Sequence, residues 1–308
     1  MINRVLIRIR ILQIYFSWSQ RDSMDLKKAE NELLFSLQKS YDLYHYYFLL
    51  IIELTDEYER RIEQRKSKLL PSERDLNPDT RLLENKFVLQ LRNNLELKKY
   101  TKDRPFLWNT YDTFVRSLLN DILQSDVYQA YCEYKDGGYE ADREFWRKVF
   151  KQYICANEEL DSILEDDSIY WNDDIEIVES FVLKTIKQFD ETRGEYQELL
   201  PMFRDEEDRD FAIDLLRNTM LNAKEYWDLI EKYTVNWESE RIAHTDMIIM
   251  QIAIAEITTC QSIPVSVSLN EYINIAKSYS TAKSSSFING VLDAVVKELR
   301  ENKKILKK

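Results

Sequence analysis

Glycine and proline are scarce in this chain, and that scarcity restricts its possible folds more than any other feature. Four Gly and five Pro occur among 308 residues. Strand-rich folds need frequent turns, and α/β folds usually place Gly where strands join helices. Aromatic residues make up 12% of the chain, which argues against disorder. The sequence therefore predicts an all-α fold.

Apolar residues recur at helical spacing along most of the chain. A first helix is expected over residues 3–20 and a very long second helix over 25–68, followed by breaks near Pro71 and Pro78. Asp136-Gly137-Gly138 predicts a loop. The later helices are expected at residues 80–99, 110–134, 141–156, 158–166, 174–189, 206–221, 223–233, 238–258, 266–279 and 284–301.

Basic residues are concentrated at the N-terminus. The formal net charge of −12 argues against a general nucleic-acid binder, because phosphate groups need local positive charge. Residues 1–20 nevertheless carry Arg4, Arg8 and Arg10 and no acid. A helix with these arginines can bind a short anionic ligand locally, although a solvated helix face accounts for them equally well.

Acidic residues gather in the middle of the chain, where residues 156–179 contain ten acids and no base. Four of them, Asp166, Asp167, Asp173 and Asp174, stand at a predicted helix end and loop without the spacing of a metal-binding loop. A solvated acidic face is the favoured interpretation, and contact with a basic partner is the alternative.

Cysteine and histidine offer little material for a metal or catalytic centre. Cys132, Cys155 and Cys260 are widely separated, and the chain contains two His. We therefore expect thiols of a reducing cytoplasm, no metal, no cofactor and no enzymatic activity. The apolar run at residues 11–16 is short and lacks a cleavage site, and no stretch is apolar enough to span a bilayer. The chain is expected to be cytoplasmic and not membrane-bound.

Two segments of the chain share residues at a constant separation of 66 positions. The matching pairs include Arg143 and Arg209, Phe145 and Phe211, and Trp171 and Trp237. One hypothesis is that residues 141–189 are a degenerate copy of the helical module that begins near residue 207. Chance alignment of two series of amphipathic helices is the alternative.

The last hundred residues contain an ordered series of motifs. The series is Asn236-Trp237 with Arg241-Ile242, Ile263-Pro264, Asn270-Glu271 with Ala276-Lys277, and Phe287-Ile288-Asn289-Gly290-Val291-Leu292-Asp293. It resembles the C-terminal half of NusB proteins in both motifs and spacing. Arg4, Arg8, Gln13 and Phe16-Ser17-Trp18 resemble the family's first helix more weakly.

The resemblance covers about residues 1–60 and 205–300, and the layout resembles the long NusB proteins of Bacteroidetes-type bacteria. It implies a NusB-like fold of two helical subdomains with a large helical insertion between them. The expected division is an N-terminal subdomain at residues 1–69, an insertion at 70–204 and a C-terminal subdomain at 205–308.

The resemblance also implies a function in transcription antitermination and in rRNA transcription and processing. Such a protein binds boxA-type single-stranded RNA as a heterodimer with the tenth protein of the small ribosomal subunit, called NusE in this role. It acts in the transcription elongation complex with other Nus factors.

Site residues follow from the same resemblance. Phosphate contacts are expected at Arg4 and Arg8, with Arg10 as an additional base, because the guanidinium fork donates two hydrogen bonds to one phosphate. Base stacking is expected at Tyr279 and Phe287, which flank a turn. Further phosphate contacts are expected at Lys277, Lys283 and the hydroxyls of Ser284-Ser285-Ser286. The partner-binding residues are expected to be Phe16, Glu240 and Asp246.

Two alternatives remain from the sequence. A helical protein-binding scaffold of the NusB fold with weak or no RNA binding is supported by the net charge of −12. An RNA cytosine methyltransferase shares a NusB-like module, but it needs a Gly-rich α/β domain, and the motifs here stand at the end of the sequence. The reduced basic surface predicts that the chain binds RNA chiefly as one half of a heterodimer. For Phe287, the alternative to base stacking is a place in the hydrophobic core.

Overall fold

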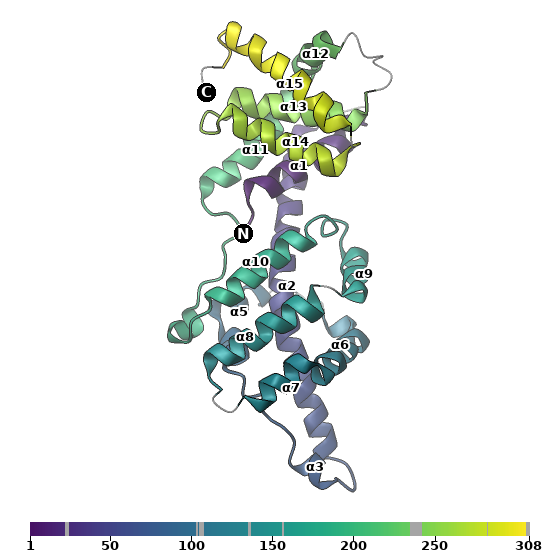
Figure 1. Ribbon diagram of the computed structural model, residues 1–308, viewed down its shortest axis with the longest axis vertical. Helices are drawn as coiled ribbons and strands as arrows, with labels where there is room; N and C mark the ends of the chain where they lie inside the picture. The colour runs from purple at the N-terminus through teal and green to yellow at the C-terminus, as the bar shows by residue number, and fades with distance from the viewer. Residues whose placement is uncertain are drawn as a thin grey trace. The chain divides into compact units, whose positions relative to one another are not determined.

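The computed structural model describes residues 1–305 apart from 22–24, 103, 105–107, 135–136, 156, 235–241 and 282. The described chain is helical throughout, as Figure 1 shows, and its only extended pairing is an isolated bridge between Ile2 and Phe203. The predicted all-α fold is confirmed. None of the helices in the described ranges combines the length and apolar character needed to cross a bilayer.

The described chain divides into two compact units. Unit 1 comprises Met1 and Lys39–Met202, and unit 2 comprises Ile2–Gln38 and Phe203–Lys308. Helix α2 (Leu26–Lys66) contributes its first part to unit 2 and its remainder to unit 1. The predicted boundaries between the two NusB-like subdomains and the insertion, at residues 69/70 and 204/205, stay a prediction.

Unit 2 is built around a central helix whose residues are mostly apolar. Five helices of this unit pack against α13 (His244–Thr259). They are α1 (Arg4–Ser19), α11 (Glu206–Leu221), α12 (Ala223–Thr234), α14 (Val265–Tyr279) and α15 (Ser284–Glu301). Every residue from Met247 to Ile257 is buried, as expected for a helix that is surrounded on all sides.

Local capping fixes where the helices of unit 2 begin. The side chain of Asn3 accepts a hydrogen bond from the backbone N–H of Leu6 at the start of α1, and Asp205 does the same for Asp208 at the start of α11. Asn and Asp suit these positions because their side-chain oxygens satisfy a backbone N–H that has no partner within the helix. Helices α1 and α11 then pack against each other.

Unit 1 is formed by the later part of α2 and a series of shorter helices. They are α3 (Glu73–Leu76), α4 (Lys86–Asn93), α5 (Leu95–Thr101), α6 (Asp112–Gln124), α7 (Asp126–Glu133), α8 (Tyr139–Val149), α9 (Glu158–Asp167) and α10 (Ile175–Gln188). Single helical turns η1 (Trp108–Thr110), η2 (Phe150–Ile154, a π-helix) and η3 (Glu191–Tyr196) complete the unit.

The core of unit 1 is rich in aromatic side chains. Tyr47, Phe48, Trp146 and Trp171 are fully buried there. The indole Nε1 of Trp171 donates to the carbonyl of Lys39 at 2.7 Å, which satisfies the polar end of the ring in the interior. The aromatic residues Tyr47 and Phe48 of α2 therefore belong to the core.

Most predicted helices occur close to their expected ranges. The segment 80–99 divides at Asn94, which is the C-cap of α4 and the N-cap of α5. The segment 110–134 divides in the same way at Ser125, whose hydroxyl accepts from the N–H of Tyr128. The expected helix start near Trp237 lies outside the described residues, so the comparison of segments around Trp171 and Trp237 stays a prediction.

The acidic stretch at residues 156–179 is not a uniformly solvated face. Asp174 is fully buried, and its Oδ2 accepts a hydrogen bond from the hydroxyl of Ser40. Glu179 is also buried, and its Oε1 accepts from the hydroxyl of Tyr47 at 3.1 Å. Asp166, Asp167 and Asp173 are exposed. The sequence interpretation was wrong for Asp174, because a polar partner on α2 stabilises it in the interior.

Candidate functional site

Arg8, one of the expected phosphate-binding residues, is buried in unit 2 and engaged by acids. Its Nε donates to Glu256 Oε2 at 2.7 Å and its Nη2 to Glu256 Oε1 at 2.8 Å. The side chain of Arg8 is 4% exposed and that of Glu256 is fully buried. A second carboxylate, Glu271 Oε2, lies 3.5 Å from Arg8 Nη1. This pairing joins α1, α13 and α14 across the core.

The carboxylate of Glu256 is satisfied by three side chains. Besides Arg8, the hydroxyl of Ser268 donates to Oε1 at 2.7 Å and that of Tyr272 to Oε2 at 2.9 Å. Burial disfavours the charged guanidinium, but hydrogen bonding and attraction to Glu256 more than offset it and raise the pKa of Arg8 above its usual value. Burial beside Glu256 raises the pKa of Tyr272 well above its usual range. These four side chains form one structural network, which we call the Glu256 network.

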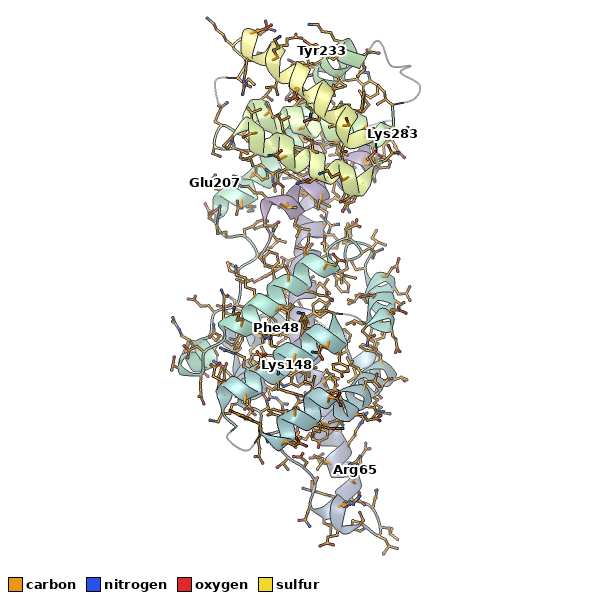
Figure 2. The ribbon with its side chains drawn as sticks, viewed as in Figure 1. Phe48, Arg65, Lys148, Glu207, Tyr233 and Lys283 are labelled. Carbon is orange, nitrogen blue, oxygen red and sulfur yellow. The ribbon has the colours of Figure 1, made fainter. Side chains whose placement is uncertain are left out.

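Arg4 and Arg10 are also engaged within unit 2. Arg4 donates from Nε to Asp208 Oδ1 at 3.0 Å and from Nη2 to Glu207 Oε1 at 2.8 Å. Arg10 is buried, and its Nη1 donates to Gln13 Oε1 at 2.8 Å. The beginning of α1 is therefore neutralised by the acidic start of α11. Glu207, labelled in Figure 2, marks that start.

The turn between α14 and α15 exposes the other expected RNA-binding residues. Lys277 and Lys283 are exposed, and Tyr279 and Phe287 are half-buried. Figure 2 shows Lys283 at this turn on the surface of unit 2. Phe287 lies in the first turn of α15 and is partly exposed to solvent. The structure thus brings these four residues together near one turn.

Hydroxyl groups hold this turn against α13. The hydroxyl of Ser280 donates to Asp246 Oδ1, and it also lies 3.0 Å from Ser284 Oγ. Thr281 Oγ1 and Ser284 Oγ are 2.7 Å apart. Asp246 is buried, and its hydrogen bond with Ser280 fixes the position of the turn against α13. A role of Asp246 in partner binding stays a prediction.

Of the two other expected partner-binding residues, Phe16 is among the described residues and Glu240 is not. Phe16 is half-buried at the end of α1, and its ring centroid lies 5.5 Å from that of His244 at the start of α13. Glu240 lies outside the described residues. Phe16 and Asp246 therefore lie at the same end of unit 2 as the turn between α14 and α15, because α13 begins at His244.

Sequence reasoning missed the Glu256 network. The available signal was a carboxylate at position 256, the one charged residue in the run from Met247 to Ile257. A charged side chain in such a run requires a buried partner of opposite charge. The basic first helix is the natural source of that partner, but only the fold shows that Arg8 faces it.

Metal binding has no support among the described side chains. Within the described ranges, no group of three or more His, Cys, Asp or Glu side chains has an arrangement that could hold a metal ion. The arrangement in unit 2 offers hydrogen-bond donors, positive charge and aromatic faces at a surface turn. Those groups suit binding of an anionic ligand with stacked bases.

Comparisons with known proteins agree with the motif series. Residues 173–297 match the model of the NusB family. The transcription antitermination protein NusB of Salinibacter ruber is 36% identical over 132 residues, which cover 41% of this chain and 82% of that protein. The NusB protein of Chloroherpeton thalassium is 42% identical over 92 residues, covering 30% of this chain and 44% of that protein.

A solved structure, described as T. maritima NusB, is 26% identical and covers 53% of this chain and 95% of that chain with a TM-score of 0.30. The family assignment depends on the sequence relatives. The matched range of the family model starts before α10 and therefore includes a helix of unit 1. The chain belongs to the NusB family of transcription antitermination proteins, as a long member with additional helices.

Proposed function

We propose that this protein is a cytoplasmic antitermination adaptor for rRNA transcription and processing. In this proposal it binds boxA-type single-stranded RNA as a heterodimer with the tenth protein of the small ribosomal subunit, NusE. It acts by binding, without catalysis, in the transcription elongation complex together with other Nus factors. Family membership supports the general role, and the geometry of unit 2 supports the RNA surface.

The observation that carries the proposal is the turn between α14 and α15. Lys277 and Lys283 are exposed there beside the half-buried rings of Tyr279 and Phe287. Single-stranded RNA is bound by this combination, because unpaired bases stack on aromatic rings while cations contact the phosphates. The turn is held by the buried Asp246, so these side chains are presented from a fixed backbone.

The engaged arginines explain why a partner is needed. Arg8 is held by Glu256, and Arg4 is held by Glu207 and Asp208. Their charges are therefore largely compensated within the protein, and little of their field reaches a phosphate. A basic ribosomal protein supplies the missing positive charge when the heterodimer forms.

The test is a titration of fluorescently labelled boxA-type RNA with the protein alone, the ribosomal partner alone and their mixture. We expect tight binding of the mixture and weaker binding by either protein alone. The double variant Lys277→Glu with Lys283→Glu should weaken RNA binding by the heterodimer at least tenfold. Lys297→Glu is the matched control, because Lys297 is exposed on α15 about 21 Å along the helix from Lys283.

The second candidate is a protein-binding scaffold without RNA affinity, and the compensated Arg4 and Arg8 favour it. The same titration separates the two functions. Absence of RNA binding by the mixture, with heterodimer formation confirmed by sedimentation, would support the scaffold and overturn the RNA adaptor. Equal loss of affinity in Lys297→Glu would show that charge alone, and not this turn, binds the RNA.

A further inference from the structure

The end of α1 carries a cation that differs from the arginines at its beginning. Arg21 follows α1 directly and is exposed. Its guanidinium carbon lies 4.1 Å from the centroid of the Trp18 ring, and its Nη2 donates to Ser17 Oγ at 3.2 Å. Within the part of the chain that the structure describes, no carboxylate lies within ion-pair distance of Arg21. Its charge is therefore available to a ligand, unlike those of Arg4 and Arg8.

The platform under Arg21 is fixed. Trp18 is buried, and its indole Nε1 donates to Glu32 Oε2 at 2.8 Å. A guanidinium held over an indole ring loses less conformational freedom when it binds a phosphate. The Arg21 side chain is thus held in place before any ligand arrives.

Contacts between neighbouring elements lead from Arg21 toward Lys283. Ser19 Oγ lies 2.8 Å from His244 Nε2, which joins the end of α1 to the start of α13. Two residues later, Asp246 accepts a hydrogen bond from Ser280 at the end of α14. Lys283 follows in the turn that leads into α15. The exposed Arg21, His244 and Lys283 therefore lie along one end of unit 2.

We propose that the RNA backbone crosses this end of unit 2 and that Arg21 and His244 contact its phosphates, in continuation of the turn between α14 and α15. The inference rests on the function proposed above and adds two binding residues to it. A phosphate is recognised by the Nη and Nε donors of Arg21 and by the Nδ1–H of His244, because Nε2 of that ring lies 2.8 Å from Ser19 Oγ. Bases on the same strand reach the rings of Tyr279 and Phe287.

This path leaves the beginning of α1 outside the RNA surface. Arg4 is 17 positions before Arg21, which corresponds to about 25 Å along a helix. Arg209, exposed on α11 beside the acids that hold Arg4, lies at that other end. Neutralising Arg21 or Arg209 changes the net charge by the same amount. A comparison of RNA binding by the two variants therefore tests which end of α1 the RNA contacts.

The experiment measures boxA-type RNA binding by the heterodimer for the wild-type protein, Arg21→Gln and Arg209→Gln over a series of salt concentrations. We expect Arg21→Gln to weaken binding by about five- to tenfold and to reduce the slope of log K against log salt by about 0.7, as expected for one lost phosphate contact on a single strand. Arg209→Gln should bind like the wild type. Arg21→Lys should keep the salt slope, because it keeps the charge.

Several outcomes overturn the inference. If the wild-type heterodimer binds RNA and Arg21→Gln binds equally well, the inference fails and the proposed function stands. If Arg209→Gln weakens binding as much as Arg21→Gln, the effect is one of net charge and the path is wrong. If the wild-type heterodimer does not bind RNA, both proposals fail. His244→Gln provides a second variant, with an expected loss of two- to fivefold, about half that of Arg21→Gln.

Discussion

Arg8 and Glu256 form a two-point ion pair inside unit 2, with nitrogen–oxygen distances of 2.7 and 2.8 Å. The pair allows a basic helix to pack on a helix that is mostly apolar. Ser268 and Tyr272 donate to the remaining positions of the carboxylate, so the buried charges are hydrogen-bonded on both sides. An arginine expected to bind RNA thus stabilises the fold.

Removing the charge of Glu256 should strongly destabilise the protein. We expect Glu256→Gln to lower the free energy of unfolding by about 3–5 kcal/mol, because it leaves the guanidinium of Arg8 buried without its main partner. Urea denaturation followed by circular dichroism measures the change. The control is Lys224→Gln, which removes an exposed pair with Asp228 at 3.7 Å and should change stability by less than about 0.5 kcal/mol. A loss below 1 kcal/mol for Glu256→Gln would contradict the structural role.

Truncation of Tyr279 should weaken RNA binding without unfolding the protein. Its ring is half-buried at the turn between α14 and α15, and stacking of one base contributes about 1–3 kcal/mol. We therefore expect Tyr279→Ala to lower the affinity of the heterodimer for boxA-type RNA by about 5- to 150-fold. Trp227→Ala is the control, since Trp227 is 40% exposed on α12. Unchanged affinity in Tyr279→Ala would exclude stacking at this residue.

Stability should depend on pH through Glu179 in unit 1. Burial raises the pKa of Glu179 to about 7, against the hydrogen bond from Tyr47. The folded protein therefore holds a proton that the unfolded chain releases near pH 4.5. The resulting stability is fully present below pH 4.5 and is lost as the pH rises through about 7.

Glu179→Gln should remove this dependence, because Gln resembles the protonated acid. We expect the variant to be more stable than the wild type by at most about 3 kcal/mol at pH 8 and by less than about 1 kcal/mol at pH 5. Urea denaturation at pH 5, 6, 7 and 8 provides the comparison, with the exposed Glu176→Gln as control. Parallel pH profiles for wild type and Glu179→Gln would show that the buried carboxyl ionises normally.

Leu69 and Leu70 should tolerate polar substitution. Their side chains are 99% and 89% exposed where α2 ends, so their removal costs no buried apolar surface. We expect Leu69→Ser with Leu70→Ser to change the free energy of unfolding by less than about 0.5 kcal/mol. The comparison is Leu54→Ser, a fully buried leucine of α2, which should cost more than 2 kcal/mol. A large loss in the double variant would show that the leucines pack in solution.

The helical fold was predictable because its signals are local. Scarce Gly and Pro, the periodic apolar residues and capping residues such as Asn3 and Asp205 act within one or two helical turns. The predicted ranges 206–221 and 284–301 coincide with α11 and α15. The family followed from the order and spacing of the C-terminal motifs, which are also properties of the sequence.

The candidate site was predictable only in part. The turn with Lys277, Tyr279, Lys283 and Phe287 lies within one stretch of sequence, and the structure places these residues near one another. The state of Arg8 was not predictable in the same way, because its partner stands 248 positions away. Arg21 was overlooked for the same reason, since the sequence does not show which basic residues are paired with an acid in the fold.

The sequence by itself determined the helices, the family and the presence of a basic first helix in an acidic chain. Tertiary structure alone decided how that basic charge is used. Packing of α1 against α11 and α13 brings Arg4 to Asp208 and Arg8 to Glu256 and leaves Arg21 exposed. The physical reason is that helix formation depends on neighbours a few residues apart, whereas the charge a residue presents to solvent depends on distant groups that folding places beside it.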